Sequence, residues 1–339
     1  MNAGQQRGDP RALILIAFGV VWLLVESGWS SGALASGLGF YWPLLVVGLG
    51  VDLLGVQRLW RLPYTVLAAG LVVVGILVAP APAAGRAVDT FREAVAPARF
   101  ANVNLTLTNV PTVVSSLSDT ATLIEARVEG RRPAAFDVQG SDTKTISVRP
   151  EGGRTRPTAI FTPNRWRIGL GRGVPIDLNV TGGSGSVRAD LSHVDLASLR
   201  AELGSGPTTL TLPDAAGRYR VTIDGGSGAA AIRVASGASL DLGLTMGSGR
   251  TTLDFGAFSA GRVTLRPGSG PVDIDVPNDA AVRLEVTRAG SGRLRLARFL
   301  TRQSGTGDTG VWASQAALRG GPAIDIVIPS AGSGGIWVH

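Results

Sequence analysis

A tripeptide repeat constrains the fold of this 339-residue chain more than any other feature of its sequence. Gly-Ser-Gly recurs in the C-terminal half at intervals of 21 or 22 residues, and a last copy at Gly332 follows after 42 residues, with the related Gly305-Thr306-Gly307 in between. The first two residues of the other copies are Gly183, Ser184, Gly204, Ser205, Gly226, Ser227, Gly247, Ser248, Gly268, Ser269, Gly290 and Ser291. So regular a period predicts an array of stacked repeats that together bury a continuous core.

Apolar and polar residues alternate on both sides of each tripeptide. Leu210 and Leu212 follow one copy, for example, and Val221 and Ile223 precede the next. Alternation with period two predicts strands with one buried face. We therefore expect each repeat to be two strands joined at a Gly-Ser-Gly corner, where glycine allows close backbone approach and successive serines can share hydrogen bonds. A β-solenoid is the favoured architecture, and a sandwich of antiparallel stacked hairpins is the alternative.

The β domain is expected to cover residues 101–339, with the tripeptide repeats at 183–334. Upstream of the repeats, shorter segments alternate in the same way and predict the less regular first part of the same domain. These segments are Val103–Leu107, Thr122–Val128, Phe136–Val138, Ile146–Val148 and Trp166–Leu170.

Three apolar runs precede the β domain. They cover about residues 12–28, 38–56 and 62–79, and each approaches the roughly 20 residues that a helix needs to cross a bilayer. A cleaved signal peptide would explain the first run but not three in succession. We interpret residues 1–80 as a multi-pass transmembrane region and 81–100 as a linker, with a juxtamembrane helix expected over 87–100.

Charged residues between the runs predict the orientation. Arg7 and Arg11 precede the first run, and Arg58 and Arg61 separate the second from the third. The positive-inside rule then places the N-terminus in the cytoplasm and, after three spans, the β domain outside the membrane. Glu26 and Asp52 lie near span ends, where we expect them to reach the solvated interface; a proton path is the alternative.

The composition excludes several functional classes. The chain has no cysteine, which excludes thiolate chemistry, and with only two histidines a multi-histidine metal site is not expected. Its net charge of +7 comes almost wholly from arginines that are scattered along the chain, with Arg131-Arg132 as the one adjacent pair. Scattered arginines without interleaved aromatic residues argue against nucleic-acid binding. No cofactor is predicted.

No catalytic constellation emerges from the motifs. Asp190, Ser192, His193 and Asp195 lie in one short segment, whereas a working triad needs groups that converge from separate elements. The glycine-rich stretches 169–173 and 182–185 lack the Lys-Ser/Thr ending of a phosphate-binding loop and are expected to be structural corners. The chain is therefore predicted not to be an enzyme.

A row of acids offers one further candidate site. Asp254, Asp273 and Asp275 alternate with core positions and are expected on an outward face. A solvated face is the favoured interpretation, and a cation bound between neighbouring repeats is the alternative.

The membrane region resembles a known family. Residues 13–28 and 40–54, with Trp42-Pro43 at the entry to the second run and glycines at 48 and 50, resemble the paired spans of the LiaI/LiaF-type module. One difference is that three apolar runs are present here, whereas members of the LiaF family look like four-span proteins. This difference puts the side of the membrane on which the β domain lies in question.

The β domain carries a longer resemblance, from about Asn102 to His339. Its first part resembles the LiaF-type C-terminal domain, in the ordered segments 166–170, 174–180, 182–185, 189–196, 199–206 and 210–213. The later repeats resemble the toast-rack β-solenoids. The resemblance implies a regulator or sensor of cell-envelope stress that contacts a sensor kinase or another membrane signalling protein. The alternative is a membrane-anchored, adhesin-like surface protein. Self-association is expected if the last residues, Gly335–His339, form an open strand edge.

Overall fold

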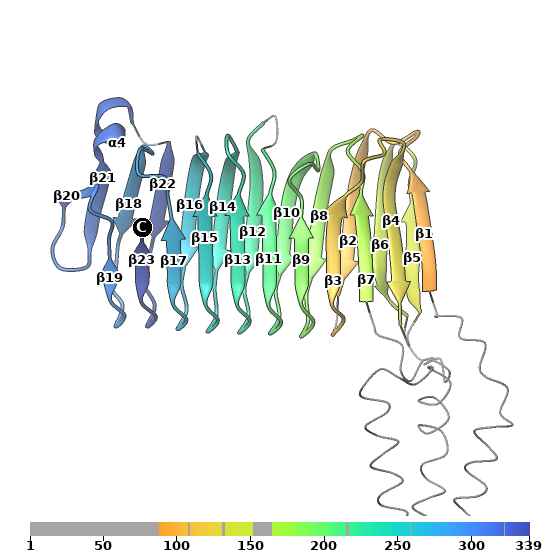
Figure 1. Cartoon of the computed structure of the whole chain (residues 1–339), viewed down its shortest axis with the longest axis horizontal. Coiled ribbons are helices and arrows are strands. Elements are labelled where there is room, and N and C mark those ends of the chain that lie inside the picture. The colour runs from red at the N-terminus through yellow and green to blue at the C-terminus, as the bar shows by residue number, and fades with distance from the viewer. Residues whose placement is uncertain are drawn as a thin grey trace, which may run out of the picture. The chain divides into compact units, whose positions relative to one another are not determined.

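The computed structural model describes residues 88–107, 109–130, 133–151, 165–214, 217–257, 259–321 and 323–339 (Figure 1). They belong to one compact unit formed by Val88–Arg154 and Asn164–His339. The three predicted spans, Glu26 and Asp52 lie outside the described residues. In the described part of the chain, no helix combines the length and the apolar character needed to cross a membrane.

The described residues form two sheets, here called sheet A and sheet B. In spatial order, sheet A contains β1 (Val88–Ala94), β4 (Thr122–Glu129), β7 (Arg165–Leu170), β3 (Thr112–Ser116), β9 (Val187–Asp190), β11 (Thr208–Leu212), β13 (Ala230–Val234), β15 (Thr251–Phe255), β17 (Val272–Asp275), β23 (Ile336–Val338) and β19 (Leu294–Arg295).

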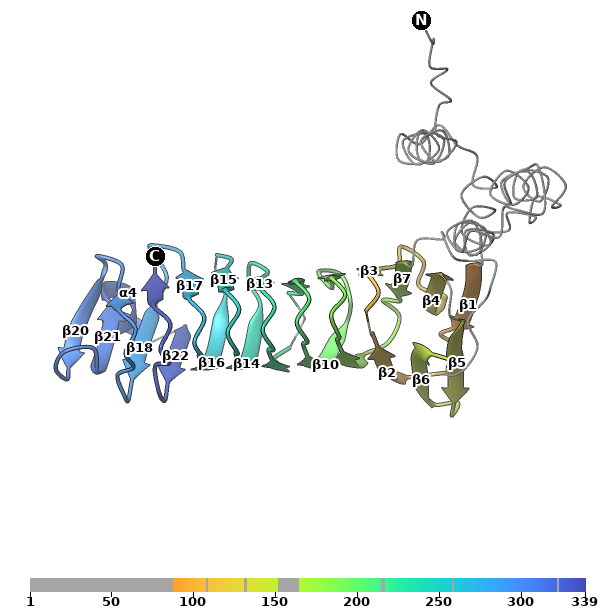
Figure 2. The ribbon, with the colours of Figure 1, turned by 90° about the horizontal axis from the view of Figure 1, so that it is seen from below.

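Sheet B faces sheet A across the core (Figure 2). In spatial order, sheet B contains β20 (Leu300–Ser304), β21 (Gly310–Ser314), β18 (Val282–Val286), β22 (Ile324–Ile328), β16 (Ala260–Arg266), β14 (Ser239–Thr245), β12 (Tyr219–Asp224), β10 (Leu196–Glu202), β8 (Ile176–Thr181), β2 (Phe100–Thr106), β6 (Thr143–Pro150) and β5 (Ala134–Gln139). One short helix, α4 (Gln315–Gly320), follows β21 and is capped by the Ser314 side chain, which accepts from the backbone N–H of Ala317.

Each tripeptide repeat contributes one strand to each sheet, and successive repeats pair in parallel. In sheet A, Leu210 is in register with Ile232, and Ile232 with Leu253. In sheet B, β10, β12, β14 and β16 pair in the same parallel manner. Parallel pairing at the repeat distance is the geometry of a solenoid and excludes the alternative of antiparallel hairpins for this part of the chain.

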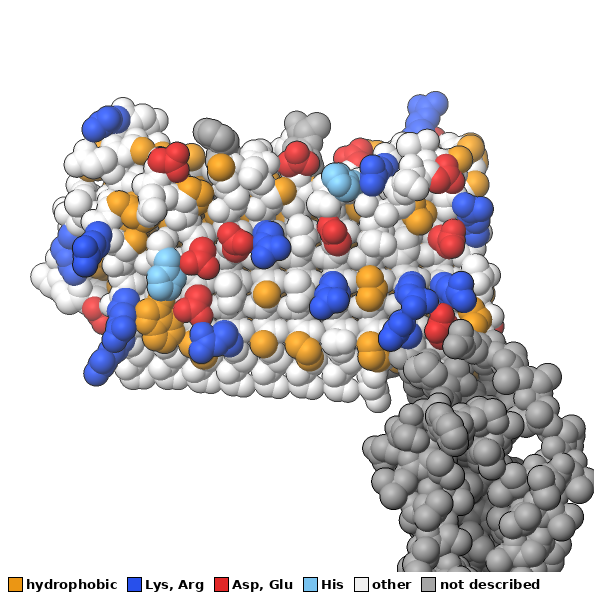
Figure 3. Space-filling model, viewed as in Figure 1, with side chains coloured by type: hydrophobic (Ala, Val, Ile, Leu, Met, Phe, Trp, Pro, Cys, Tyr) orange, Lys and Arg blue, Asp and Glu red, His pale blue; other side chains and the backbone are white. Residues whose placement is uncertain are grey.

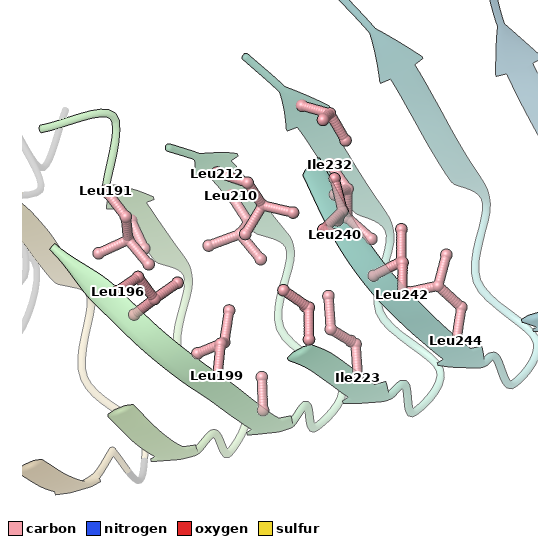
Figure 4. Packing of buried hydrophobic residues seen from close by; sticks show 14 of the residues in the cluster. Leu191, Leu196, Leu199, Leu210, Leu212, Ile223, Ile232, Leu240, Leu242 and Leu244 are labelled. Atoms are coloured by element: carbon pink, nitrogen blue, oxygen red, sulfur yellow. The ribbon is translucent and has the colours of Figure 1, made fainter. Parts of the chain in front are cut away.

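The core lies between the two sheets and continues from coil to coil. The residues that alternate in the sequence point inward, and Leu212, Leu240 and Leu242 are at most 2% exposed. Figure 4 shows such side chains from successive coils following one another between the sheets. Burying each large aliphatic side chain stabilises the fold by roughly 1.5–3 kcal/mol. The repeat is therefore stable only as an array.

The N-terminal end of the unit differs from the prediction. The segment expected to be a juxtamembrane helix contains β1 (Val88–Ala94), which pairs antiparallel with β4 along its whole length, so the helix prediction is wrong. The β structure thus begins at Val88 rather than at residue 101. Phe91 of β1 stacks on Phe136 of β5 with ring centroids 5.0 Å apart, and this pair closes the end of the core. The five strands predicted upstream of the repeats are confirmed as β2, β4, β5, β6 and β7.

The C-terminal end has an order of strands that the chain order does not suggest. The last two strands, β22 and β23, insert between the coil of β16 and β17 and the coil of β18 and β19. Gly332 therefore stacks between Gly268 and Gly290. The related triplet Gly305-Thr306-Gly307 lies in the β20–β21 hairpin and is not a corner of the stack.

This insertion also corrects the expectation of an open edge at the C-terminus. β23 pairs with β17 on one side and with β19 on the other, so Gly335–His339 does not form an edge. The C-terminal edges among the described strands are β19 in sheet A and β20 in sheet B.

Candidate interaction surface

The Gly-Ser-Gly corners form a row along one side of the solenoid. A Cβ atom on Gly206, Gly228 or Gly249 would overlap the carbonyl oxygen of the corresponding glycine one coil earlier. The backbone N–H of Gly206 donates to Gly183 O at 3.3 Å, and other corners repeat this contact. Glycine is required here because the backbones approach so closely.

The serines of these corners point into solvent. All seven, Ser184, Ser205, Ser227, Ser248, Ser269, Ser291 and Ser333, are exposed. The hydrogen bonds found between neighbouring corners join backbone groups. Shared hydrogen bonds between the serine side chains remain a prediction.

The outer face of sheet A is organised by ion pairs between neighbouring coils. Arg233 Nε lies 3.1 Å from Asp254 Oδ2, and Arg250 Nη1 lies 2.6 Å from Asp273 Oδ2. Because Asp254 and Asp273 are bound by arginines of the preceding coil, a cation between coils would have to displace these contacts. No group of three or more potential metal ligands gathers among the described residues.

Ion pairs also join neighbouring coils on the outer face of sheet B. Asp325 of β22 accepts from Arg262 Nη2 at 3.0 Å and from Arg283 Nη1 at 2.8 Å, so it joins the coils on both sides. Hydrogen bonds to Asp325 and then to Glu285 raise the pKa of the Arg283 guanidinium. Closer to the N-terminal end, polar side chains pair across coils, as in the 2.6 Å bond from Ser198 to Asp177.

The residues tested for a catalytic triad form a turn. Asp190 Oδ1 accepts from the backbone N–H of Ser192 at 3.1 Å. Hydrogen bonds from the side chain and then the backbone of Ser192 lower the pKa of the Asp190 carboxyl. His193 is exposed at the same turn. Such an arrangement fixes the backbone of a turn but brings no groups together from separate elements.

The glycine-rich stretch 169–173 serves packing. A Cβ on Gly169 would overlap the Leu117 side chain, and one on Gly171 would overlap the carbonyl oxygen of Thr122. The N–H of Gly171 donates to Leu123 O at 2.8 Å, so it is not free for a phosphate. In the second stretch, the N–H of Gly182 donates to Glu202 O at 2.7 Å.

Lys144 is a residue whose importance the sequence reasoning missed. It is the only lysine of the chain and only 5% exposed. Its Nζ donates to Glu93 Oε1 at 2.6 Å, to Ala94 O at 2.7 Å and to Ala96 O at 3.1 Å, so all three of its donors are used. The sequence did contain a signal for its burial, because Lys144 lies on the same face of β6 as the buried Ile146 and Val148, two and four residues later.

These contacts join the two sheets at the N-terminal end. Lys144 belongs to β6 of sheet B, whereas Glu93 belongs to β1 of sheet A. The lysine therefore fixes the first strand of the β unit, and the residues directly after it, to the opposite sheet.

Comparison with known proteins agrees with this architecture. Residues 98–233 match the family model of the N-terminal domain of toast_rack. No curated protein matches the chain.

Solved structures of low similarity were also found. They are a "putative cell adhesion protein" from Clostridium sporogenes (14% identity, 74% of this chain and 97% of that chain, TM-score 0.37) and "putative adhesins" from Parabacteroides distasonis (12%, 75% and 98%, 0.35) and Bacteroides fragilis (11%, 75% and 98%, 0.33). Residues 98–233 of the all-β unit are therefore similar to the N-terminal domain of toast_rack, and the match covers less than half of the chain.

Proposed function

We propose that this chain is a multi-pass membrane protein of the cell envelope that regulates or senses envelope stress through contacts of its β unit outside the membrane. Its three apolar runs support the membrane anchor, and the extended outer faces of the two sheets, where ion pairs join neighbouring coils, support a role in macromolecular contact. Catalytic turnover is not expected, because the candidate catalytic residues form a turn. The signalling partner would be a sensor kinase or another membrane protein reached through the spans.

The observation that carries the regulatory role is the attachment of β1. Only residues 80–87 separate the third apolar run from Val88, where β1 begins. β1 is then fixed by seven residues of pairing with β4 and by the buried Lys144–Glu93 contact. A protein that only needs an anchor can use a long flexible linker. A short connection into an ordered strand suits a protein whose spans must respond to the state of the β unit.

A membrane-anchored adhesin-like protein is the second candidate. The two sheets contain 11 and 12 strands, and such extended faces suit multivalent contact with another surface. In that case the apolar runs would serve only as anchors, and any segment with the same number of spans could replace them.

A replacement of the spans separates the two functions. A strain that lacks the chain would carry a transcriptional reporter of the response to wall-active antibiotics, and it would be complemented with the full chain or with a chimera in which residues 1–80 are an unrelated three-span segment. The regulatory proposal predicts an altered reporter response in the deletion strain, restoration by the full chain and no restoration by the chimera. An unchanged response in the deletion strain contradicts regulation. Restoration by the chimera would instead favour simple anchoring.

A further inference from the structure

Two arginines on the outer face of sheet A take their carboxylate partners from the next coil. Arg250 directly follows the corner Gly247–Gly249 and bonds to Asp273 in the coil on its C-terminal side. Arg233 likewise bonds to Asp254, one coil further along the stack. Neighbouring strands of a sheet are about 4.8 Å apart, so each arginine finds its partner one strand away.

The terminal coil has the arginines but no following coil. Arg293 follows the corner Gly290–Gly292 directly, the position that Arg250 holds in its own coil, and Arg295 also faces outward. Their strand β19 is the edge of sheet A. Both side chains are exposed, and neither forms an ion pair with any described residue. No further strand of sheet A follows β19, so no strand of a next coil supplies a carboxylate to these arginines.

A tryptophan lies beside these arginines. Trp337 of β23 is in register with Arg295 and points to the same outer face. A Cβ on Gly335 would overlap the six-membered ring of Trp337, so the indole lies flat against the backbone at Gly335. Its other side remains partly exposed. The indole thus forms a flat apolar platform, with Arg295 on the neighbouring edge strand.

Arginines outnumber acidic residues around this platform. Arg288, before the corner, and Arg298, in the turn after β19, are also exposed and form no ion pair with a described residue. Asp308 lines the small depression next to Arg293, and Asp273, on the other side of Trp337, is held by Arg250. Figure 3 shows Lys and Arg side chains at the C-terminal end of this face, with Asp and Glu side chains among them.

We propose that this edge, formed by Trp337, Arg293 and Arg295 with Arg288 and Arg298 beside it, binds a carboxylated polysaccharide. A uronate carboxylate would take the place that an aspartate of the next coil holds elsewhere, where the planar guanidinium can bind both of its oxygens. The apolar face of a sugar ring would pack on the indole. The inference rests on the proposed function, since it names the class of envelope ligand that the β unit contacts.

A single-stranded nucleic acid fits the edge less well. Proteins that bind such strands stack successive bases on several aromatic side chains. Among the described residues of this edge, Trp337 is the outward-facing aromatic residue that lies beside Arg293 and Arg295. The ion pairs of the stack also indicate carboxylate as the natural partner of arginines in this position.

Binding to polygalacturonate tests the inference. The probe would be added to the full chain in nanodiscs, with methyl-esterified polygalacturonate as the uncharged comparison. We expect binding of the acidic polymer only. The variant Arg288→Gln/Arg293→Gln/Arg295→Gln/Arg298→Gln should bind at least about tenfold more weakly. The matched control is Arg165→Gln/Arg188→Gln/Arg220→Gln/Arg266→Gln, which removes the same charge from exposed arginines without ion pairs elsewhere and should stay within about twofold.

Replacing Trp337 tests packing on the indole separately from the charge of the arginines. Trp337→Thr should weaken binding about fivefold at both low and high salt, because packing on the indole is not screened by ions. Circular dichroism would confirm that each variant is folded. If the quadruple arginine variant does not fold, the double variant Arg288→Gln/Arg298→Gln replaces it, because it changes only residues outside strands. The double variant should still weaken binding about threefold.

Several results would overturn the inference. They are absence of binding, equal binding of the esterified polymer, equal loss in the matched control, or tighter binding of a single-stranded oligonucleotide. Each of these would leave the regulatory proposal standing, because that proposal is tested separately by the stress reporter.

Discussion

Lys144 and Glu93, 51 residues apart in the chain, meet at 2.6 Å between Nζ and Oε1 and join β6 of sheet B to β1 of sheet A. The lysine side chain is 6% exposed and that of Glu93 is 27% exposed. The lysine is therefore shielded from water far better than the arginines of the other ion pairs among the described residues, of which Arg283, at 33%, is the least exposed. It is also the contact through which the segment after the predicted spans is held to the opposite sheet.

Replacing this lysine should destabilise the N-terminal end. Lys144→Met keeps the apolar length of the side chain but leaves Glu93 and the carbonyl groups of Ala94 and Ala96 without their donor. We expect a loss of about 1–3 kcal/mol in the free energy of unfolding, measured with denaturant, and faster amide exchange in β1. Arg149→Gln is the matched control on the same strand, because the Arg149–Asp137 pair is exposed and should contribute less than about 1 kcal/mol. Equal effects of the two changes would contradict a structural role for Lys144.

A methyl group at a corner should disrupt the stack. Gly249→Ala places a Cβ against the carbonyl oxygen of Gly228, and backbone atoms on both sides cannot move without breaking the pairing of the coils. Overpacking of this kind costs about 1–3 kcal/mol. Gly217→Ala is the control, since a Cβ there meets no atom within 4 Å. Thermal unfolding of both variants measures the difference, and an unaffected Gly249→Ala protein would show that the corners tolerate side chains.

The inserted C-terminal coil should hold the end of the solenoid together. Ile326 of β22 is completely buried between β16 and β18, so Ile326→Ala should cost about 2–5 kcal/mol. Because β22 joins these two strands, hydrogen exchange should rise in β16 and in β18–β21 together. Leu318→Ala, at a side chain that is 52% exposed, should change stability by less than about 0.5 kcal/mol. A local effect confined to β22 would argue against the joining role.

Tyr219 should make the stability of the β unit sensitive to alkaline pH. Its hydroxyl donates to Pro213 O at 2.6 Å, and burial, followed by the charge of Asp214, raises the pKa of Tyr219. The neutral form therefore stabilises the fold below the unfolded-state pKa of about 10, and this contribution is lost as the pH rises above it. Tyr219→Phe should cost about 0.5–1.5 kcal/mol at neutral pH and should flatten the alkaline decline in a series of denaturant titrations. An identical decline in both proteins would assign it to other groups.

The sequence predicted the repeated part of the fold well, because its signals are local. Alternation at Leu210 and Leu212, and again at Val221 and Ile223, fixes which residues face the core, and the tripeptides fix where the strands turn. The same reasoning placed Asp190, Ser192, His193 and Asp195 in one short segment, which the structure shows to contain a turn. Period and parity therefore define the coil.

Three features could not be predicted from the sequence because they depend on contacts between distant residues. The interval of 42 residues between Gly290 and Gly332 is compatible with a skipped coil, and nothing local indicates that Gly332 returns to stack on Gly268. Phe91 and Phe136 lie in weakly alternating segments, and only their mutual stacking makes the end of the core. At the interaction surface, Trp337 and Arg295 become neighbours only through the insertion of β23.

The side of the membrane on which the β unit lies is the central claim, and the absence of cysteine makes it directly measurable. Ser248→Cys places a thiol at an exposed corner of the solenoid, and Gln57→Cys places one in the loop predicted to be cytoplasmic. Intact cells would be treated with a membrane-impermeant maleimide before and after lysis. Labelling of Ser248→Cys in intact cells, with Gln57→Cys labelled only after lysis, is the predicted result. Labelling of Ser248→Cys only after lysis would place the β unit in the cytoplasm and contradict the account.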